Sequence, residues 1–154
     1  MNIRAPITSR DTRLAESAAR LRFAIVRTAR RLRQEAAGGG TELTPTSASA
    51  LATVERHGPL TPSELAEIER IKRPTATRTL RVLDEAGLVD RAADPGDGRS
   101  SLVSVNSAGR ERLRRLRGRK NAYLARRMRD LPDSDVVTLE RAAEILEGIL
   151  EERR

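Results

Sequence analysis

The feature that most limits the fold of this chain is a proline within a run that otherwise has helical periodicity. Pro74 follows Arg73, and a proline ring pushes the preceding residue away from helical angles, so the helices on either side cannot be continuous. We expect a turn around Ile71 and a second helix from Pro74. Gly87 should end that helix in the left-handed conformation that closes many helices.

The first of these two helices has its own start signal. Thr61 and Glu64 have the spacing of a capping box, and Pro62 stands at the first helical position, where a missing N–H costs nothing. The helix is therefore predicted to begin at Thr61 and to stop near Arg70. Its core candidates are Leu65, Ala66 and Ile68.

The second helix has two chemically different faces. One carries Ala76, Leu80 and Leu83, and the opposite one carries hydroxyl and guanidinium groups. Arginine can donate two hydrogen bonds to a guanine edge, and threonine can bond a base or touch a thymine methyl. The candidate base-reading residues are Arg73, Thr75, Thr77, Arg78 and Arg81. The alternative is an ordinary solvated helix face.

Two short strands are predicted after this helix, at 88–91 and 102–105. Between them, residues 94–99 read Asp-Pro-Gly-Asp-Gly-Arg, which is dense in turn formers, so the strands should pair as a hairpin. A helix-turn-helix followed directly by a hairpin is a winged helix.

The region resembles the MarR family of bacterial transcriptional regulators, named for multiple antibiotic resistance. Residues 83–91 are similar to its L-x-x-x-G-L-V-x-R pattern, and Asp97-Gly98-Arg99 is similar to its D-x-R wing signature. The family usually ends the second strand in Leu-Thr. This chain has Val-Asn-Ser instead, and we expect Ser107 to cap the next helix.

The resemblance implies that Arg99 reaches the minor groove of DNA and that Asp97 positions it. The alternative for this pair is a salt bridge that holds the hairpin together.

Long helices with apolar seams are predicted at both ends of the chain. The stripe of helix 11–36 is Leu14, Ala18, Leu21, Ile25, Thr28 and Leu32. The stripe of the last helix, after Leu131-Pro132, is Val136, Leu139, Ala143, Leu146 and Leu150. Such periodicity fits an intramolecular core or a dimer seam equally well. The family resemblance implies that the terminal helices of two chains interleave into a homodimer.

Two further helices are expected between these regions. The helix at 44–57 should bury Ala48, Leu51, Ala52 and Val54, after a glycine connector at 38–40. The helix at 107–129 begins with a basic segment, 110–120, that is either a solvated face or a phosphate contact, and Gly118 could permit a bend in it.

The expected fold class is mainly α with a small β-hairpin wing. We expect a winged helix-turn-helix DNA-binding domain at 41–106. An N-terminal arm and dimerisation helix at 1–40 and C-terminal dimerisation helices at 107–154 should flank it.

Composition narrows the function. The net charge of +8 favours a polyanionic partner, nucleic acid before membrane. The chain has no Cys and one His, and it lacks a phosphate loop, so we expect neither an enzyme nor a metal site or other cofactor. No apolar run approaches the ~20 residues of a membrane span. The first ten residues lack the apolar core of a signal peptide, which predicts a cytoplasmic protein.

The leading hypothesis is a homodimeric, sequence-specific transcriptional regulator of double-stranded DNA, with repression the more common role in the family. The alternatives are a non-specific architectural DNA-binding protein or an adaptor built on a winged helix. The resemblance also implies a small anionic aromatic effector in a cleft between the dimer arms and the winged helix. Its candidate contacts are Phe23, Tyr123, Arg20 and Arg27, although the residue types alone favour core or dimer packing for the two aromatic residues.

Overall fold

The structure, a computed structural model, describes residues 8–36, 43–93 and 101–150. Its elements in chain order are α1 (Ser9–Ala36), α2 (Pro45–His57), α3 (Pro62–Ile68), α4 (Arg73–Glu85), β1 (Val89–Ala93), β2 (Ser101–Val105), α5 (Ser107–Met128) and α6 (Asp133–Leu150). The predicted class, mainly helical with one small hairpin, is confirmed. The predicted glycine connector at 38–40 and the wing tip lie outside the described residues.

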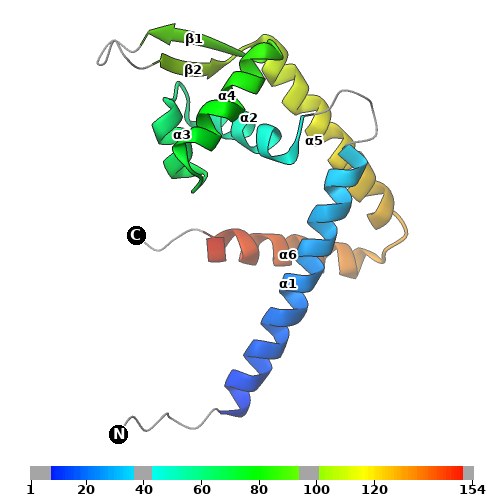
Figure 1. Ribbon diagram of the computed structural model, residues 1–154. Coiled ribbons are helices and arrows are strands. Elements are labelled where there is room, and N and C mark those ends of the chain that lie inside the picture. Colours follow the sequence, from blue (N-terminus) through cyan, green and yellow to red (C-terminus); the bar gives the residue numbers. More distant parts are fainter. Residues whose placement is uncertain (1–7, 37–42, 94–100, 151–154) are drawn as a thin grey trace, which may run out of the picture.

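The core lies in the winged unit formed by α2, α3, α4 and the hairpin (Figure 1). β1 and β2 pair antiparallel in a register that runs from Val89 opposite Val105 to Ala93 opposite Ser101. The largest fully buried side chains are Leu51, Val54, Leu65, Leu80, Leu83 and Val103. With so few aromatic residues in the chain, this core is built from branched aliphatic side chains.

A short extra bridge joins the helices to the hairpin. The backbone N–H of Leu60 donates to the carbonyl of Val103 at 3.0 Å, and the N–H of Val103 donates back at 2.8 Å. Both residues are buried. The segment before α3 therefore covers one edge of the hairpin, an arrangement that the sequence patterns did not reveal.

The predicted start and end signals are present. Thr61 and Glu64 form a complete capping box in front of α3. At the other end of the helix pair, Gly87 has φ +67°, its N–H donates to the carbonyl of Asp84, and the N–H of Leu88 donates to that of Leu83. These two bonds form a Schellman motif, which aims the chain from α4 into the wing.

Two expectations about the helix pair are wrong. Arg73 is the first helical residue, because the chain is already extended at Lys72 and Pro74 stands in the first turn, where it removes no helical hydrogen bond. Ile68 does not join the core and is 44% exposed. Leu65 and Ala66 are buried, and Ile68 stands roughly 60° beyond Leu65 on the side away from Ala66, which places it at the edge of the buried side.

Two expectations about the wing and the next helix are also corrected. Leu88 belongs to the turn and β1 begins at Val89. The cap of α5 is Asn106, not Ser107: its side-chain oxygen accepts from the N–H of Gly109 at 2.9 Å. An N-cap needs extended backbone, which Asn106 has at the end of β2. α5 continues through Gly118 without interruption.

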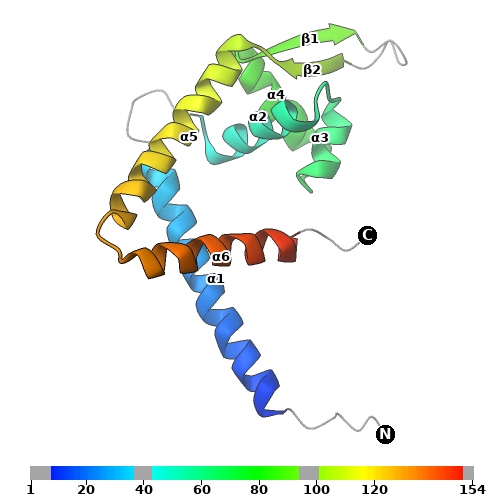
Figure 2. The same ribbon diagram turned by 180° about the vertical axis from the view of Figure 1, so that it is seen from behind.

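α1 extends away from the winged unit, whereas α5 leads from that unit to α6, which runs back below it (Figures 1 and 2). The C-terminal part of α1 packs beside α5. Most of the predicted apolar seam is exposed in the single chain, with Leu14 at 58% and Leu139 at 46%. An intramolecular core is therefore the wrong interpretation of these seams. Within the described residues, none of the helices is both long and apolar enough to cross a membrane.

The close approach of α5 to the α4–β1 turn generates a stability prediction. A Cβ on Gly109 would lie 2.1 Å from the backbone oxygen of Leu88, so Gly109→Ala should cost about 1–3 kcal/mol through overpacking. Gly118 has open space, so Gly118→Ala should instead stabilise by roughly 0.5–1 kcal/mol. Urea unfolding at one fixed protein concentration measures both. Equal effects of the two substitutions would contradict the packing at Gly109.

Candidate nucleic-acid interface

The outward face of α4 is set by what its other face buries. Ala76, Thr79, Leu80 and Leu83 are buried against the core of the winged unit. They lie on one side of the helix, which leaves the opposite side to solvent. The exposed residues of α4 include every base-reading candidate in it: Arg73, Thr75, Thr77, Arg78 and Arg81.

A shallow hollow of about 540 Å³ runs along this face. It is lined by Arg73, Pro74, Thr77, Arg78 and Arg81. Arg81 has an ion-pair partner on its own helix, Glu85, at 3.6 Å. Among the described residues, the guanidinium groups of Arg73 and Arg78 have no such partner. Two of the three arginines are therefore available to an external anion or base edge without breaking an intramolecular ion pair.

The two threonines on α4 differ in what their hydroxyls do. The hydroxyl of Thr77 donates to the backbone carbonyl of Arg73, one turn earlier, at 3.1 Å. The hydroxyl of Thr75 has no hydrogen-bond partner among the described residues. Thr75 is thus free to donate, whereas the donor of Thr77 is already used.

The wing is tied to the end of α4 by an ion pair. Arg91 of β1 donates to the carboxylate of Asp84 at 2.7 Å and to the hydroxyl of Ser101 of β2 at 3.3 Å. One guanidinium therefore links α4 to both strands. The side-chain amide of Asn106 adds a bond to the carbonyl of Gly87 at 3.1 Å. Asp97 and Arg99 lie outside the described residues, so the roles expected of this pair remain predictions.

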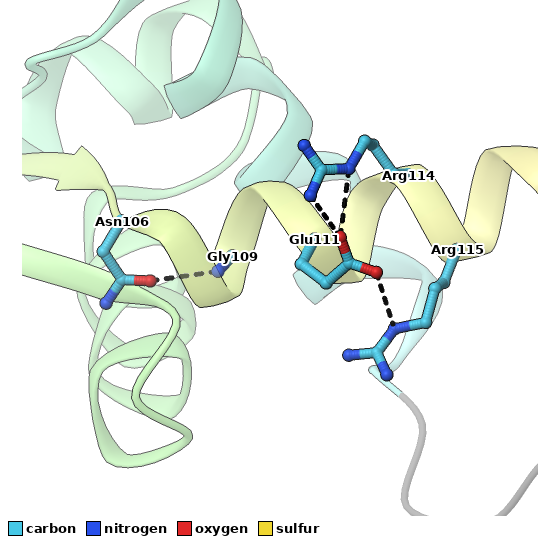
Figure 3. Close-up of polar contacts among 5 residues, drawn as sticks. All are labelled: Asn106, Gly109, Glu111, Arg114 and Arg115. Atoms are coloured by element: carbon cyan, nitrogen blue, oxygen red, sulfur yellow. Dashed lines mark hydrogen bonds and ion pairs between the residues drawn. The ribbon is translucent and has the colours of Figure 1, made fainter.

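The basic segment of α5 makes contacts within the chain. Glu111 pairs with both Arg114 and Arg115 (Figure 3). The hydrogen bond and charge of Arg114 lower the pKa of the Glu111 carboxyl below its ordinary value. Further along, Arg117 pairs with Glu55 of α2, and Arg119 donates to the carbonyl of Ala36 at 3.0 Å. These two arginines join α5 to α2 and to α1.

Three of the four candidate effector residues line one cleft. Phe23, Arg27 and Tyr123 face a hollow of about 850 Å³ between α1 and α5, and Arg20 is not among its lining residues. Tyr123 accepts hydrogen bonds from Arg31 at 3.2 Å and from Arg127 at 3.4 Å. The bond from Arg127, and then that from Arg31, lowers the pKa of the Tyr123 hydroxyl because each stabilises its charged form.

A second cavity, of about 570 Å³, lies where α1, α2 and α5 meet. Its walls are mostly aliphatic, including Leu32, Leu43 and Leu113, and Arg33 and Lys120 also line it. This cavity adjoins the winged unit, where the family resemblance places an effector, whereas the candidate residues line the first cleft. The sequence did not indicate this second cavity, because its walls come from three helices that are far apart in the chain.

Sequence reasoning also missed functional candidates near α4. Lys72 is exposed directly before the helix and adds a cation to its N-terminal end. The Asp84–Arg91 pair was likewise not singled out, although opposite charges on either side of a helix-ending glycine could have indicated it.

His57, the single histidine, is exposed at the end of α2. In the described part of the chain, no group of acidic or imidazole side chains could hold a metal ion.

Comparison with known proteins decides the family. The family model described as MarR family matches residues 41–100. An HTH-type transcriptional regulator of Mycobacterium bovis is 36% identical over 142 residues, covering 92% of this chain and 96% of that protein. The chain belongs to the MarR family. A relative of the same description from Mycobacterium leprae is 34% identical over the same length and coverage.

Solved structures agree with this MarR-family assignment. The crystal structure of a transcriptional regulator from Pseudomonas aeruginosa has a TM-score of 0.79 and 34% identity, covering 94% of this chain and 98% of that one. A MarR family protein from Bacillus stearothermophilus, at 21% identity, shares the fold with a TM-score of 0.77, covering 92% and 98%. The protein is thus a DNA-binding transcriptional regulator of the winged helix-turn-helix type, a class distinct from enzymes.

Proposed function

We propose that this MarR-family protein is a homodimeric repressor that binds a pseudo-palindromic duplex through the outward face of α4. The observation that carries the proposal is the row of exposed arginines on α4, two of which have no ion-pair partner in the part of the chain that the structure describes. A guanidinium group without an ion-pair partner can donate two hydrogen bonds to the edge of a guanine in the major groove. A bound protein that covers the duplex blocks other proteins from it, which favours repression.

Homodimerisation is supported by the exposed apolar residues of the terminal helices. α1 presents Phe23 and Val26 at 58% and 54% exposure, and α6 presents Val137 and Ile149 at 61% and 68%. Apolar surface of this extent favours burial against a partner. We propose that residues 1–40 and 107–154 form this dimer and that residues 41–106 bind DNA. Because its target is the chromosome, the protein is proposed to act in the cytoplasm.

Selection of bound duplexes from a random pool, at one stated salt concentration, tests this function. Two copies of α4 should select two half-sites about one helical turn, roughly 34 Å, apart. A shared sequence with one half-site would contradict the dimer. Recovery of no shared sequence, with equal salt dependence on all duplexes, would support a non-specific architectural role instead.

Arg78→Ala should weaken binding to the selected duplex by about 1–3 kcal/mol and relax its base preference, because a base-reading guanidinium is removed. The affinity for a scrambled duplex should change much less. Fluorescence anisotropy on both duplexes measures the difference. Equal losses on the two would show that Arg78 contacts only the backbone.

Release by a small anionic aromatic effector is the second part of the proposal. The first cleft supports it because aromatic rings and guanidinium groups lie together there. The guanidinium carbon of Arg27 lies 5.5 Å from the centre of the Phe23 ring, and that of Arg127 lies 5.5 Å from the centre of the Tyr123 ring. A planar carboxylate could stack and pair in such a site. It can shift DNA affinity only if it binds two forms of the dimer differently.

Benzoate serves as a probe of this cleft. It should lower the affinity for the selected duplex, and Tyr123→Ala should abolish that response without changing affinity in its absence. Ala48→Leu, which narrows the second cavity, is the matched control. Loss of the response in Ala48→Leu alone would assign the effector to the second cavity. No response in the unaltered protein would remove benzoate-like effectors from the proposal.

A further inference from the structure

The two exposed threonines of α4 lie on different sides of the helix, and only Thr77 lies in the row formed by Arg73 and Arg81. Arg73, Thr77 and Arg81 follow one another at spacings of four, so they share one side of the helix. Thr75 is two residues from Thr77 and therefore lies roughly 160° away around the helix. Asp84, seven residues after Thr77, shares the Thr77 side and pairs with Arg91 of the wing.

The hydrogen bond of Thr77 determines which of its groups faces outward. Its hydroxyl is directed back to the carbonyl of Arg73, 3.1 Å away. The staggered geometry at Cβ turns the methyl group away from the hydroxyl. Thr77 is exposed and lines the hollow between Arg73 and Arg81, so with its O–H donor engaged the methyl is the apolar group that this side chain offers to a ligand.

We propose that Thr77 is a specificity-determining residue that recognises the 5-methyl group of a thymine, whereas Thr75 recognises DNA through its hydroxyl. The proposal rests on the proposed function, because it requires α4 to enter the major groove. There a thymine presents its methyl group beside the O4 acceptor, and apolar contact with that methyl distinguishes thymine from the other bases. The flanking guanidinium groups of Arg73 and Arg81 would bond neighbouring base edges or phosphates and hold the methyl groups together.

Replacement of each thymine of the selected duplex by deoxyuridine tests this inference, since deoxyuridine removes only the methyl group. At one position, replaced in a single half-site, the substitution should weaken binding of the unaltered protein about fourfold, the value expected for one buried methyl, and about fifteenfold when the matching position of both half-sites is replaced. Thr77→Val keeps the methyl and should retain this difference between thymine and uracil. Thr77→Ser keeps the hydroxyl and should bind both duplexes equally.

Thr75 provides the matched control, because there the hydroxyl and not the methyl is expected to contact DNA. Thr75→Ser keeps its hydroxyl and should bind like the unaltered protein, whereas Thr75→Val should lose about threefold to tenfold in affinity for each half-site, as expected for one hydrogen bond from each copy of α4. Both positions are exposed, so the thermal unfolding midpoints of all four variants should match that of the unaltered protein.

The outcomes separate this inference from the proposed function. A selected sequence whose thymines can all be replaced without loss overturns the inference alone. So does the opposite result at position 77, in which Thr77→Val abolishes the distinction and Thr77→Ser keeps it. A pool that yields no shared sequence contradicts the proposed function and the inference with it.

Discussion

Burial of one side of α4 is the constraint on which the rest of the structure depends. Leu80 and Leu83 are fully buried together with Leu51 of α2 and Val103 of β2. Burying side chains of this size stabilises the fold by about 1.5–3 kcal/mol each, more than any surface ion pair contributes. The helix therefore has one allowed rotation about its own axis, and the arginines on its other side must face outward. The exposure of these arginines is therefore a consequence of how the core packs.

The C-terminal end of α4 is joined to β1 and β2 by a helix-ending turn and an ion pair. The Schellman motif at Gly87 sets the direction of the chain, and Arg91 links Asp84 to both strands. Gly109 lets α5 begin directly against the same turn. α5 then carries the connection towards α1, through the bond from Arg119 to Ala36. In the proposed homodimer, a change in how two chains pack along α1 and α6 would reach the proposed DNA-binding face along this route.

Local rules predicted what neighbouring residues determine. The capping box at Thr61 and the helix end at Gly87 depend on a few adjacent residues, and both were predicted correctly. Ile68 was assigned wrongly because a seven-residue helix leaves its burial to tertiary packing. The Leu60 bridge and the two clefts join segments far apart in the chain, which no periodicity reveals. On α4 the pattern indicated the exposed face, but only the structure distinguishes the hydroxyl of Thr77, which donates to a backbone carbonyl, from that of Thr75, which has no partner within residues 8–36, 43–93 and 101–150.

Site-directed cross-linking to DNA tests the central claim, that the outward face of α4 lies against base edges, most directly. The chain has no cysteine, so Glu85→Cys places a single photoactivatable label on that face, and Glu140→Cys places one on α6 as the control. The account predicts cross-links from position 85 to bases at two sites about one helical turn apart in the duplex, with none from position 140. Cross-linking from position 140 alone, or equally from both positions, would contradict it.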